Sequence, residues 1–130
     1  MTEVPADLTG GAGAGPDVIV RADARGMIFF VSGTCRVLGY EPADLVGKLG
    51  LDFVHPDDRQ RFVENTASLY GPGAASKPRA RVHRFRRKDG SWAWLRGNPK
   101  ILPSADGRPG ELLNFFEPIS EQAAARALRG

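Results

Sequence analysis

The chain has 130 residues, 42% of them apolar and 25% charged, which is the balance of one globular domain with a single core. Its single cysteine excludes an internal disulfide, and no apolar run approaches the roughly 20 residues that a bilayer span needs. The net charge of +3 comes from one segment, because seven Lys or Arg residues and no acidic residue lie between Lys77 and Lys88. The start of the chain has neither the basic residues nor the apolar run of a signal peptide, so we expect a cytoplasmic domain without membrane contact.

The first structured element predicted by the sequence is a β-hairpin. Residues 1–16 are rich in glycine and have little to bury, so we expect them to be a flexible linker. The segments "VIVRAD" (18–23) and "MIFFVS" (27–32) have the composition of strands, and Gly26 lies in the turn between them. Glycine reaches positive φ without steric strain, which suits a tight hairpin turn.

Three short helical segments are predicted next. The first begins at Ser32, a candidate N-cap, and ends at Gly39, where glycine commonly terminates helices. The second lies in "EPADLVGK", with proline at its first position. The third begins near His55, which precedes Pro56 and is expected to form part of the helix cap.

A longer amphipathic helix and a second hairpin follow. Apolar residues at three- and four-residue spacing predict the helix over residues 56–70, with "GPG" (71–73) as its stop. The segment "RARVHRFRRKDGSWAWLRGNPKILP" then reads as two long strands joined at Asp89-Gly90, which is a strong hairpin signal.

The last strand is predicted in "ELLNFFEPI", and an exit helix begins after Ser120, a candidate cap, and occupies residues 121–130. Five antiparallel strands with the helices grouped together indicate an α+β fold. We expect a five-stranded antiparallel sheet with the short helices and the one longer helix on one face, and a domain that spans residues 17–120.

Four segments, in this order, resemble the PAS sensory domain with its C-terminal PAC segment, of the subgroup common in bacterial sensor histidine kinases. They are "PDVIVRADARGMIFFVS", "LGYEPADLVG", "FVHPDDRQRF" and "FRRKDGSWAWLRG". The resemblance implies a non-enzymatic sensory or interaction module of a two-component signalling protein. A ligand or partner would change the domain, and the C-terminal helix would relay that change.

The resemblance leaves a second interpretation open. The chain has seven phenylalanines, which are enough to fill a core solidly. The domain is then a ligand-free module for homodimerisation or for contact with another signalling domain. A small-molecule ligand of unidentified chemistry and a homodimer are therefore both expectations.

The resemblance also assigns a signal relay to Glu117, Ile119 and Ser120, although Pro118 stands where the family has an aspartate. From Ser32 to Gly39 the spacing is one residue shorter than in the family, which leaves the form of the first helix open.

Cofactor chemistry is not expected. The letters "TCRVLG" resemble a flavin-reactive cysteine motif, but Cys35 precedes the Gly39-Tyr40 pair, whereas the family's cysteine follows it. We expect a buried, inert thiol and no flavin. The family's best-known haem ligand is a histidine on the long helix, and residues 59–70 contain none, so no haem is expected. The two histidines and one cysteine have no zinc-site spacing, and no catalytic constellation is present.

If a pocket exists, strand alternation and family position predict which residues lie near it. His83 shares a strand face with Phe85 and is also expected to be a hydrogen-bonded polar group of the core. The basic segment is expected to form a solvated or interface surface and not to bind nucleic acid. The residues expected near the pocket are Ile28, Phe30, Phe62, His83, Phe85, Trp94 and Leu113.

Overall fold

The computed structural model describes residues 16–70, 80–108 and 110–129. The expected linker, apart from Pro16, and the expected "GPG" helix stop lie outside these ranges.

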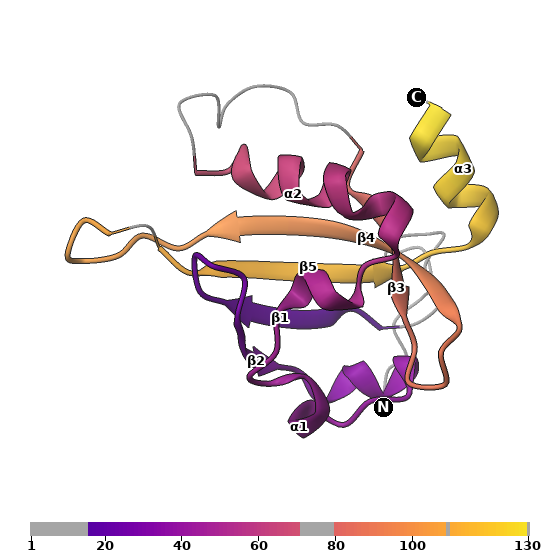
Figure 1. Ribbon diagram of the computed structural model, residues 1–130, viewed down its shortest axis with the longest axis horizontal. Helices are drawn as coiled ribbons and strands as arrows, with labels where there is room; N and C mark the ends of the chain where they lie inside the picture. The colour runs from indigo at the N-terminus through magenta and orange to yellow at the C-terminus, as the bar shows by residue number, and fades with distance from the viewer. Residues whose placement is uncertain (1–15, 71–79, 109, 130) are drawn as a thin grey trace, which may run out of the picture.

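A five-stranded antiparallel sheet forms the centre of the domain, with strand order β2-β1-β5-β4-β3. The two strands nearest the chain ends, β1 and β5, pair in the middle of the sheet, as Figure 1 shows. The α+β class and the five-stranded antiparallel sheet are therefore confirmed. The strands are β1 (Val18–Ala22), β2 (Ile28–Val31), β3 (Val82–Arg86), β4 (Trp92–Ile101) and β5 (Leu112–Pro118).

Both predicted hairpins are present, and an aspartate organises each turn. The Asp23 carboxylate accepts the backbone N–H groups of Arg25 and Met27 at 2.9 and 3.0 Å. The Asp89 carboxylate accepts the backbone N–H of Ser91 at 2.9 Å. Gly26 lies at φ 92°, a left-handed conformation that other residues adopt only with strain.

The helical region between β2 and β3 lies along one side of the sheet (Figure 1). In chain order it contains η2 (Gly33–Leu38), α1 (Pro42–Leu45), η3 (Gly50–Phe53), η4 (Pro56–Asp58) and α2 (Arg59–Ala67), where η marks a 3₁₀-helix. The predicted longer helix thus begins as a separate 3₁₀ turn.

The first helix is a 3₁₀-helix, which accounts for its short sequence. A 3₁₀-helix rises roughly 2.0 Å per residue against roughly 1.5 Å in an α-helix, so fewer residues span the same distance. It ends at Gly39 with φ 90°. Ser32 precedes the helix, but the prediction of a side-chain cap is wrong, because its hydroxyl accepts the backbone N–H of Ile19 in β1 at 2.9 Å.

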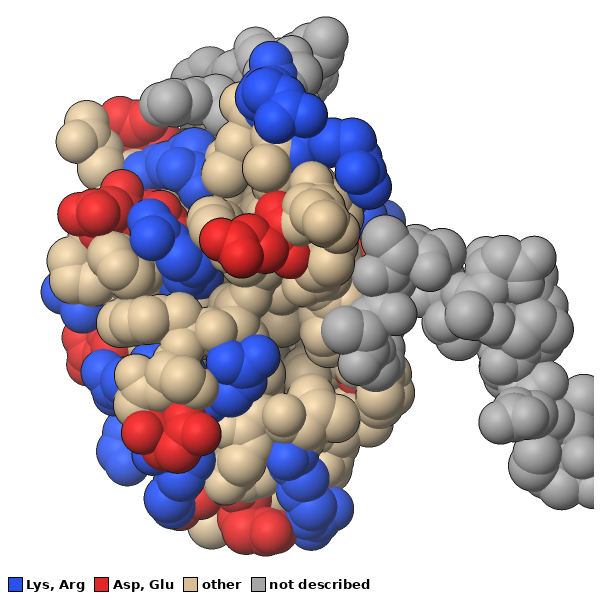
Figure 2. All heavy atoms as spheres, turned by 90° about the vertical axis from the view of Figure 1, so that its right-hand side faces the viewer, with Lys and Arg blue, Asp and Glu red and all other residues tan. Residues whose placement is uncertain are grey.

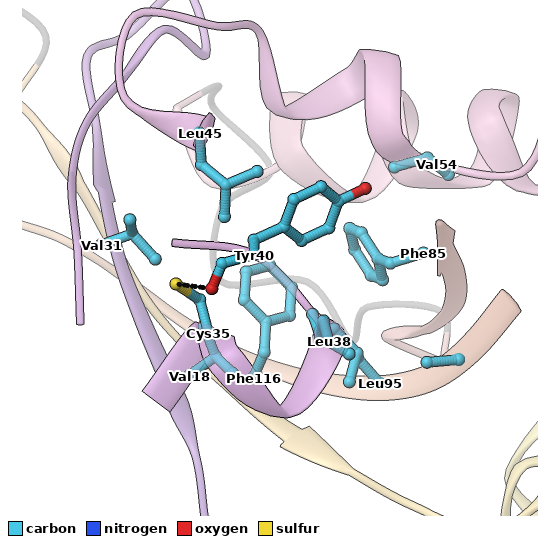
Figure 3. Packing of buried hydrophobic residues seen from close by; sticks show 11 residues of the cluster. Val18, Val31, Cys35, Leu38, Tyr40, Leu45, Val54, Phe85, Leu95 and Phe116 are labelled. Carbon is cyan, nitrogen blue, oxygen red and sulfur yellow. Dashed lines mark hydrogen bonds between the residues drawn. The ribbon is translucent and has the colours of Figure 1, made fainter. Parts of the chain in front are cut away.

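The main apolar core lies between the sheet and the helical region. It includes Cys35 and Tyr40 from the helical side and Phe85 and Phe116 from the sheet (Figure 3). The Phe85 and Phe116 rings meet edge to face at 4.9 Å between centroids. The Tyr40 hydroxyl donates to the backbone oxygen of Arg86 at 2.8 Å, so its polar end is satisfied inside the core.

The C-terminal helix α3 (Glu121–Arg129) packs on the other face of the sheet. Its Ala123 and Ala124 form a second buried cluster with Val82 and Ile119. Val82 alternates with the core-facing His83 along β3, so the two side chains point to opposite faces. Among the described residues no helix is both long enough and apolar enough to cross a membrane.

A buried ion pair joins the segment before α2 to the edge strand β3. Asp58 is only 3% exposed. Its carboxylate accepts the backbone N–H of Arg84 at 2.8 Å and two guanidinium N–H groups of the same residue at 2.9 and 3.1 Å. The backbone N–H of His55 donates to the Arg84 oxygen at 2.8 Å. Burial alone would raise the pKa of Asp58, but the Arg84 hydrogen bonds and the charges of Arg84 and Arg61 outweigh it and hold that pKa below its ordinary value.

Replacing Asp58 with asparagine tests this attachment. Asp58→Asn leaves the Arg84 guanidinium without its partner, and breaking a buried pair lowers the free energy of unfolding by roughly 3 kcal/mol. Chemical denaturation measures the loss. Asp57→Asn, at the exposed neighbouring carboxylate, is the control and changes the free energy of unfolding by less than about 0.5 kcal/mol. Equal losses in the two variants would contradict the role of the ion pair.

Candidate ligand-binding site

A cavity of about 380 Å³ lies between the sheet and the helical region. This volume falls within the roughly 300–1,000 Å³ typical of small-molecule sites. Alternate residues of β1 and β5 line it, because register pairs Val20 with Asn114 and Ala22 with Leu112 on the same face. The strand residues in its wall are Val18, Val20, Ala22, Ile28, Phe85, Arg86, Leu95, Leu112, Asn114 and Phe116.

The helical wall of the cavity is also largely apolar, and it reaches solvent on one side. Leu51, Phe62 and other apolar side chains line it. Leu49, just before η3, and Val63 of α2 belong to the wall yet remain 38% and 48% exposed. A cavity with this lining suits an apolar ligand that enters between α2 and the segment before η3.

Few polar groups face the cavity, and two of them already have partners. The hydroxyl of Tyr40 donates to the Arg86 backbone oxygen, as described above, and that of Tyr70 donates to the Gly110 backbone oxygen at 3.1 Å. Asn114 differs, because its Oδ1 accepts the backbone N–H of Asn98 at 3.0 Å while its Nδ2 has no hydrogen-bond partner among the described residues.

Three of the seven residues expected near a pocket line the cavity, namely Ile28, Phe62 and Phe85. His83 lies beside them, with its ring centroid 5.1 Å from that of Phe62 and 6.4 Å from that of Phe85. It lines a smaller adjoining void instead.

The remaining three expected residues, Phe30, Trp94 and Leu113, are on the opposite face of the sheet. Phe30 pairs with Arg21, which pairs in turn with Leu113, and this row points away from the cavity. The register shifts between Arg21 and Ala22, so the alternation that would place Ile28 and Phe30 on one face is interrupted. Trp94 alternates with Leu95, which lines the cavity, and packs instead beside the α3 cluster.

Sequence reasoning missed most of the strand wall. Val18, Leu112, Asn114 and Phe116 were not expected near the pocket, although the last three alternate along β5. In the sequence of this strand, LLNFFEP, apolar residues occupy both faces, so alternation does not separate them, and the burial of every second residue is visible only in the structure. A buried asparagine among those apolar positions is the most informative of these residues, because such a side chain needs a hydrogen-bond partner.

His83 is buried but not fully hydrogen-bonded. The side chain is 3% exposed, and its Nε2 has no hydrogen-bond partner among the described residues. The expectation of a satisfied polar core group is therefore wrong for this atom. Burial lowers the pKa of His83 to about 4, with Arg61 and Arg81 adding to the shift and Asp58 opposing it. The ring is neutral at physiological pH.

Cys35 is buried as expected and does not line the cavity. Its side chain has no exposed surface, and its Sγ donates to the Tyr40 backbone oxygen at 3.4 Å (dashed line in Figure 3). Burial raises the pKa of the thiol, although the charge of Arg36 opposes the shift. A thiol of raised pKa is a poor nucleophile, and this one has no path to a molecule in the cavity.

The basic residues described in the segment that ends at Lys88 make contacts within the domain. Arg84 pairs with Asp58, Arg86 lies over the Phe53 ring, and Lys88 pairs with Asp44 at 3.0 Å. Figure 2 shows Lys and Arg interspersed with Asp and Glu on the face drawn there. These contacts stabilise the fold. The surface drawn in Figure 2 is not uniformly basic.

The three residues expected to relay a signal lie at the end of β5 and just before α3. Glu117 pairs with Arg96 of β4 at 3.3 Å, and the backbone N–H of Ile119 donates to the Trp94 oxygen at 3.1 Å. The Ser120 hydroxyl accepts the backbone N–H of Ala123 at 3.0 Å and caps the helix as predicted. Within the described ranges, no group of three or more His, Cys, Asp or Glu residues is arranged to hold a metal ion.

The architecture defines a small α+β module with one sheet folded over an internal apolar cavity. The model of the PAS fold family matches residues 27–115, and the chain belongs to that family. PAS domains are generally sensory or interaction modules.

Two curated relatives are similar to parts of this chain. White collar 2 protein of Neurospora crassa is 38% identical over 71 residues, which are 54% of this chain and 13% of the relative. The aryl hydrocarbon receptor nuclear translocator homolog of Drosophila melanogaster is 28% identical over 97 residues, which are 74% of this chain and 15% of the relative. The chain thus spans about a seventh of the length of these relatives.

Solved structures share the fold at low sequence identity. A light-oxygen-voltage domain studied with a flavin analogue has a TM-score of 0.70 at 21% identity, with 87% of this chain and 84% of that chain covered. The PAS-B domain of Drosophila melanogaster Cycle with bound ethylene glycol has a TM-score of 0.67 at 18% identity, covering 78% and 99%. A sensory box histidine kinase/response regulator of Burkholderia thailandensis has a TM-score of 0.65 at 19% identity, covering 87% and 85%.

The buried His83 predicts how stability depends on pH. An unfolded histidine titrates near 6.5, whereas the pKa of His83 in the folded domain is about 4. Between these values the unfolded chain binds a proton that the folded chain does not, so the free energy of unfolding falls as the pH drops from 6.5 toward 4. The full loss is on the order of 3 kcal/mol. Urea denaturation at a series of pH values measures it.

The variant His83→Phe removes this pH dependence, because a phenylalanine does not titrate. His55 Nδ1 accepts the backbone N–H of Asp57 at 3.0 Å and so caps the turn as predicted. His55→Asn is the control, since asparagine also serves as a helix cap, and it keeps the dependence on His83. A slope between pH 6.5 and 4 that is unchanged in His83→Phe would refute the assignment.

Proposed function

We propose that this domain is the sensory module of a cytoplasmic signalling protein and that it binds a small apolar ligand in the cavity described above. The observation that carries the proposal is the cavity of about 380 Å³ with an almost entirely apolar wall. The sensory domain comprises residues 17–120, with the strands from β3 onward as its PAC segment, and residues 121–130 are the signalling helix. The domain itself is not an enzyme, and it uses neither flavin nor haem.

The parent protein we propose is a bacterial sensor histidine kinase of a two-component system. The similarity of fold to a sensory box histidine kinase supports this setting. The curated relatives are eukaryotic proteins, which favours a second setting in which the domain serves a eukaryotic signalling protein. In both settings the domain supplies recognition and the remainder of the protein supplies the output.

The path for the signal runs along β5 into α3. Asn114 and Phe116 of β5 line the cavity, and Ile119 lies three residues after Phe116, in the cluster that holds α3. The domain then has two states that differ in the position of β5. Moving β5 changes the hydrogen bond from Ile119 to β4 and the packing of α3. The ligand must bind the two states with different affinity, since otherwise it shifts no population.

The alternative function is assembly with a second copy or with another signalling domain through the outer face of the sheet. Phe29 and Phe30 are 44% and 42% exposed on the edge strand β2, and the guanidinium of Arg21 lies 5.0 Å from the Phe29 ring centroid. Exposed aromatic residues beside an arginine are typical of interface centres. The similarity to the nuclear translocator homolog and to Cycle PAS-B also favours this reading.

A pair of substitutions on β1 tests the ligand site. Val20→Phe extends an aromatic ring into the cavity, whereas Ile19→Phe adds the same ring on the other face of the strand. The neutral fluorophore N-phenyl-1-naphthylamine is the probe. We expect it to bind the wild type and Ile19→Phe alike, and to bind Val20→Phe at least tenfold more weakly.

Fluorescence titration measures the three affinities, and circular dichroism checks that each variant is folded. Binding of equal affinity to both variants would place the probe outside the cavity. If no probe binds the wild type and native mass spectrometry of freshly purified protein detects no bound small molecule, the ligand-free alternative is correct.

A second pair of substitutions tests how α3 is held. Ala124→Asp puts a charge into the buried cluster with Val82, whereas Ala125 is exposed and Ala125→Asp is the control. We expect amide hydrogen exchange over residues 121–129 to accelerate in Ala124→Asp, because an unpaired buried charge favours the undocked helix. Probe affinity stays within twofold of wild type in both variants. Exchange that is equally slow in both would mean that the cluster does not hold the helix.

A further inference from the structure

A second void of about 10 Å³ adjoins the cavity. The void lies directly beside the cavity, because the two share four wall residues: Phe62, Thr66, Asn114 and Phe116. A volume near 10 Å³ is about the minimum that holds one water-sized group. Unlike the cavity, this void has several polar side chains in its wall, namely Asn65, Thr66, Arg81, His83 and Asn114.

Two buried polar side chains of the void each have one nitrogen without a hydrogen-bond partner among the described residues. Asn114 is 7% exposed, and the N–H of Asn98 on its Oδ1 fixes which end of the amide carries the free hydrogens. Its Nδ2 is therefore a donor with no acceptor among the described residues. His83 is 3% exposed and its Nε2 is also unpartnered within the described ranges. A polar group without a partner in such a place favours a ligand atom that supplies the missing hydrogen bond.

A glycine makes room for this arrangement. Gly97 of β4 faces Phe116 of β5, and a Cβ added there would lie 3.2 Å from Asn114 Oδ1 and 3.5 Å from a Phe116 ring carbon. The φ of Gly97 is not positive, so the glycine is explained by space and not by backbone conformation. An alanine at this position would crowd the Asn114 amide and reduce the void.

The charged residues nearby have other contacts. Arg81 lines the void and donates to the Asn65 backbone oxygen at 3.1 Å, while Arg61 donates to the Val82 backbone oxygen. Asp58 is held by Arg84. The void has room for one polar atom and is too small for a carboxylate or phosphate. The Asn114 amide can donate a hydrogen bond to that atom.

We propose that this void is a polar subsite that takes one neutral oxygen, a carbonyl or a hydroxyl, of a ligand whose apolar body fills the main cavity. The Asn114 Nδ2 group donates to that oxygen, and His83 forms the far wall. The ligand class is thus a compact hydrocarbon with a single ketone, aldehyde or alcohol group. This proposal rests on the proposed function, because it requires that the cavity binds a ligand.

A matched pair of ligands tests the subsite. 2-Acetylnaphthalene carries a ketone oxygen, and 2-isopropylnaphthalene has nearly the same shape without a hydrogen-bonding group. Displacement of N-phenyl-1-naphthylamine from the full chain measures both affinities. One hydrogen bond contributes roughly 1 kcal/mol net, so we expect the ketone to bind about fivefold more tightly.

Two variants remove the preference by different means. Asn114→Leu removes the donor, but it also removes the hydrogen bond from Asn98. Gly97→Ala keeps both and only crowds the void, so it separates the effect of the subsite from the effect of the lost Asn98 contact. Both are expected to bind the two ligands with equal affinity. Ile19→Phe is the control and keeps the preference.

Each outcome has a separate meaning. If both ligands bind the wild type with equal affinity, the subsite proposal is overturned and the cavity function stands; a resident water in the void gives this result. A preference that persists in both variants also overturns it. If neither ligand nor the fluorophore binds the wild type, the proposed function itself fails.

Discussion

The buried carboxylate of Asp58 joins the helical layer to the edge strand of the sheet, and the cavity lies between these two layers. Its three hydrogen bonds to Arg84 fix the start of α2 to the exposed edge of β3. The attachment of α2 continues through polar contacts, since Arg61 donates to the Val82 oxygen and Asn65 Nδ2 donates to the Ala80 oxygen at 3.1 Å. Hydrogen bonds thus join α2 to the β3 edge of the sheet. The face of α2 that carries Phe62 does not have to pack directly against the central strands. The space that remains over β1 and β5 is the cavity.

Adjacent residues of one strand point to opposite faces of the sheet. Val20 faces the cavity and Ile19 faces the outside, while Phe116 and Glu117 divide in the same way on β5. The proposed ligand site and the proposed assembly surface therefore lie on opposite faces of the sheet. The cluster of Ile119 with α3 lies on the outer face and also includes Val82 of β3, so the proposed signal has to cross the sheet through the backbone of its strands.

Local signals in the sequence predicted most of the fold but only part of the site. The hairpin turns, the Gly39 helix stop and the Ser120 cap depend on residues a few positions apart, and they are where the sequence places them. The wall of the cavity depends on which face each strand presents, and a one-residue shift reverses every side chain. The bulge near Arg21 moved Phe30 to the outer face, and no local pattern reveals it. The unpaired Asn114 amide requires the pairing of β4 with β5, which is a long-range feature.

In the proposed function the inner face of the sheet, and not the outer one, receives the ligand. Intermolecular nuclear Overhauser effects between bound N-phenyl-1-naphthylamine and assigned methyl groups distinguish the two faces. We expect contacts from the probe to the methyls of Val18, Val20 and Leu95. Contacts confined to Ile19 and Leu113, on the opposite face, would contradict the claim.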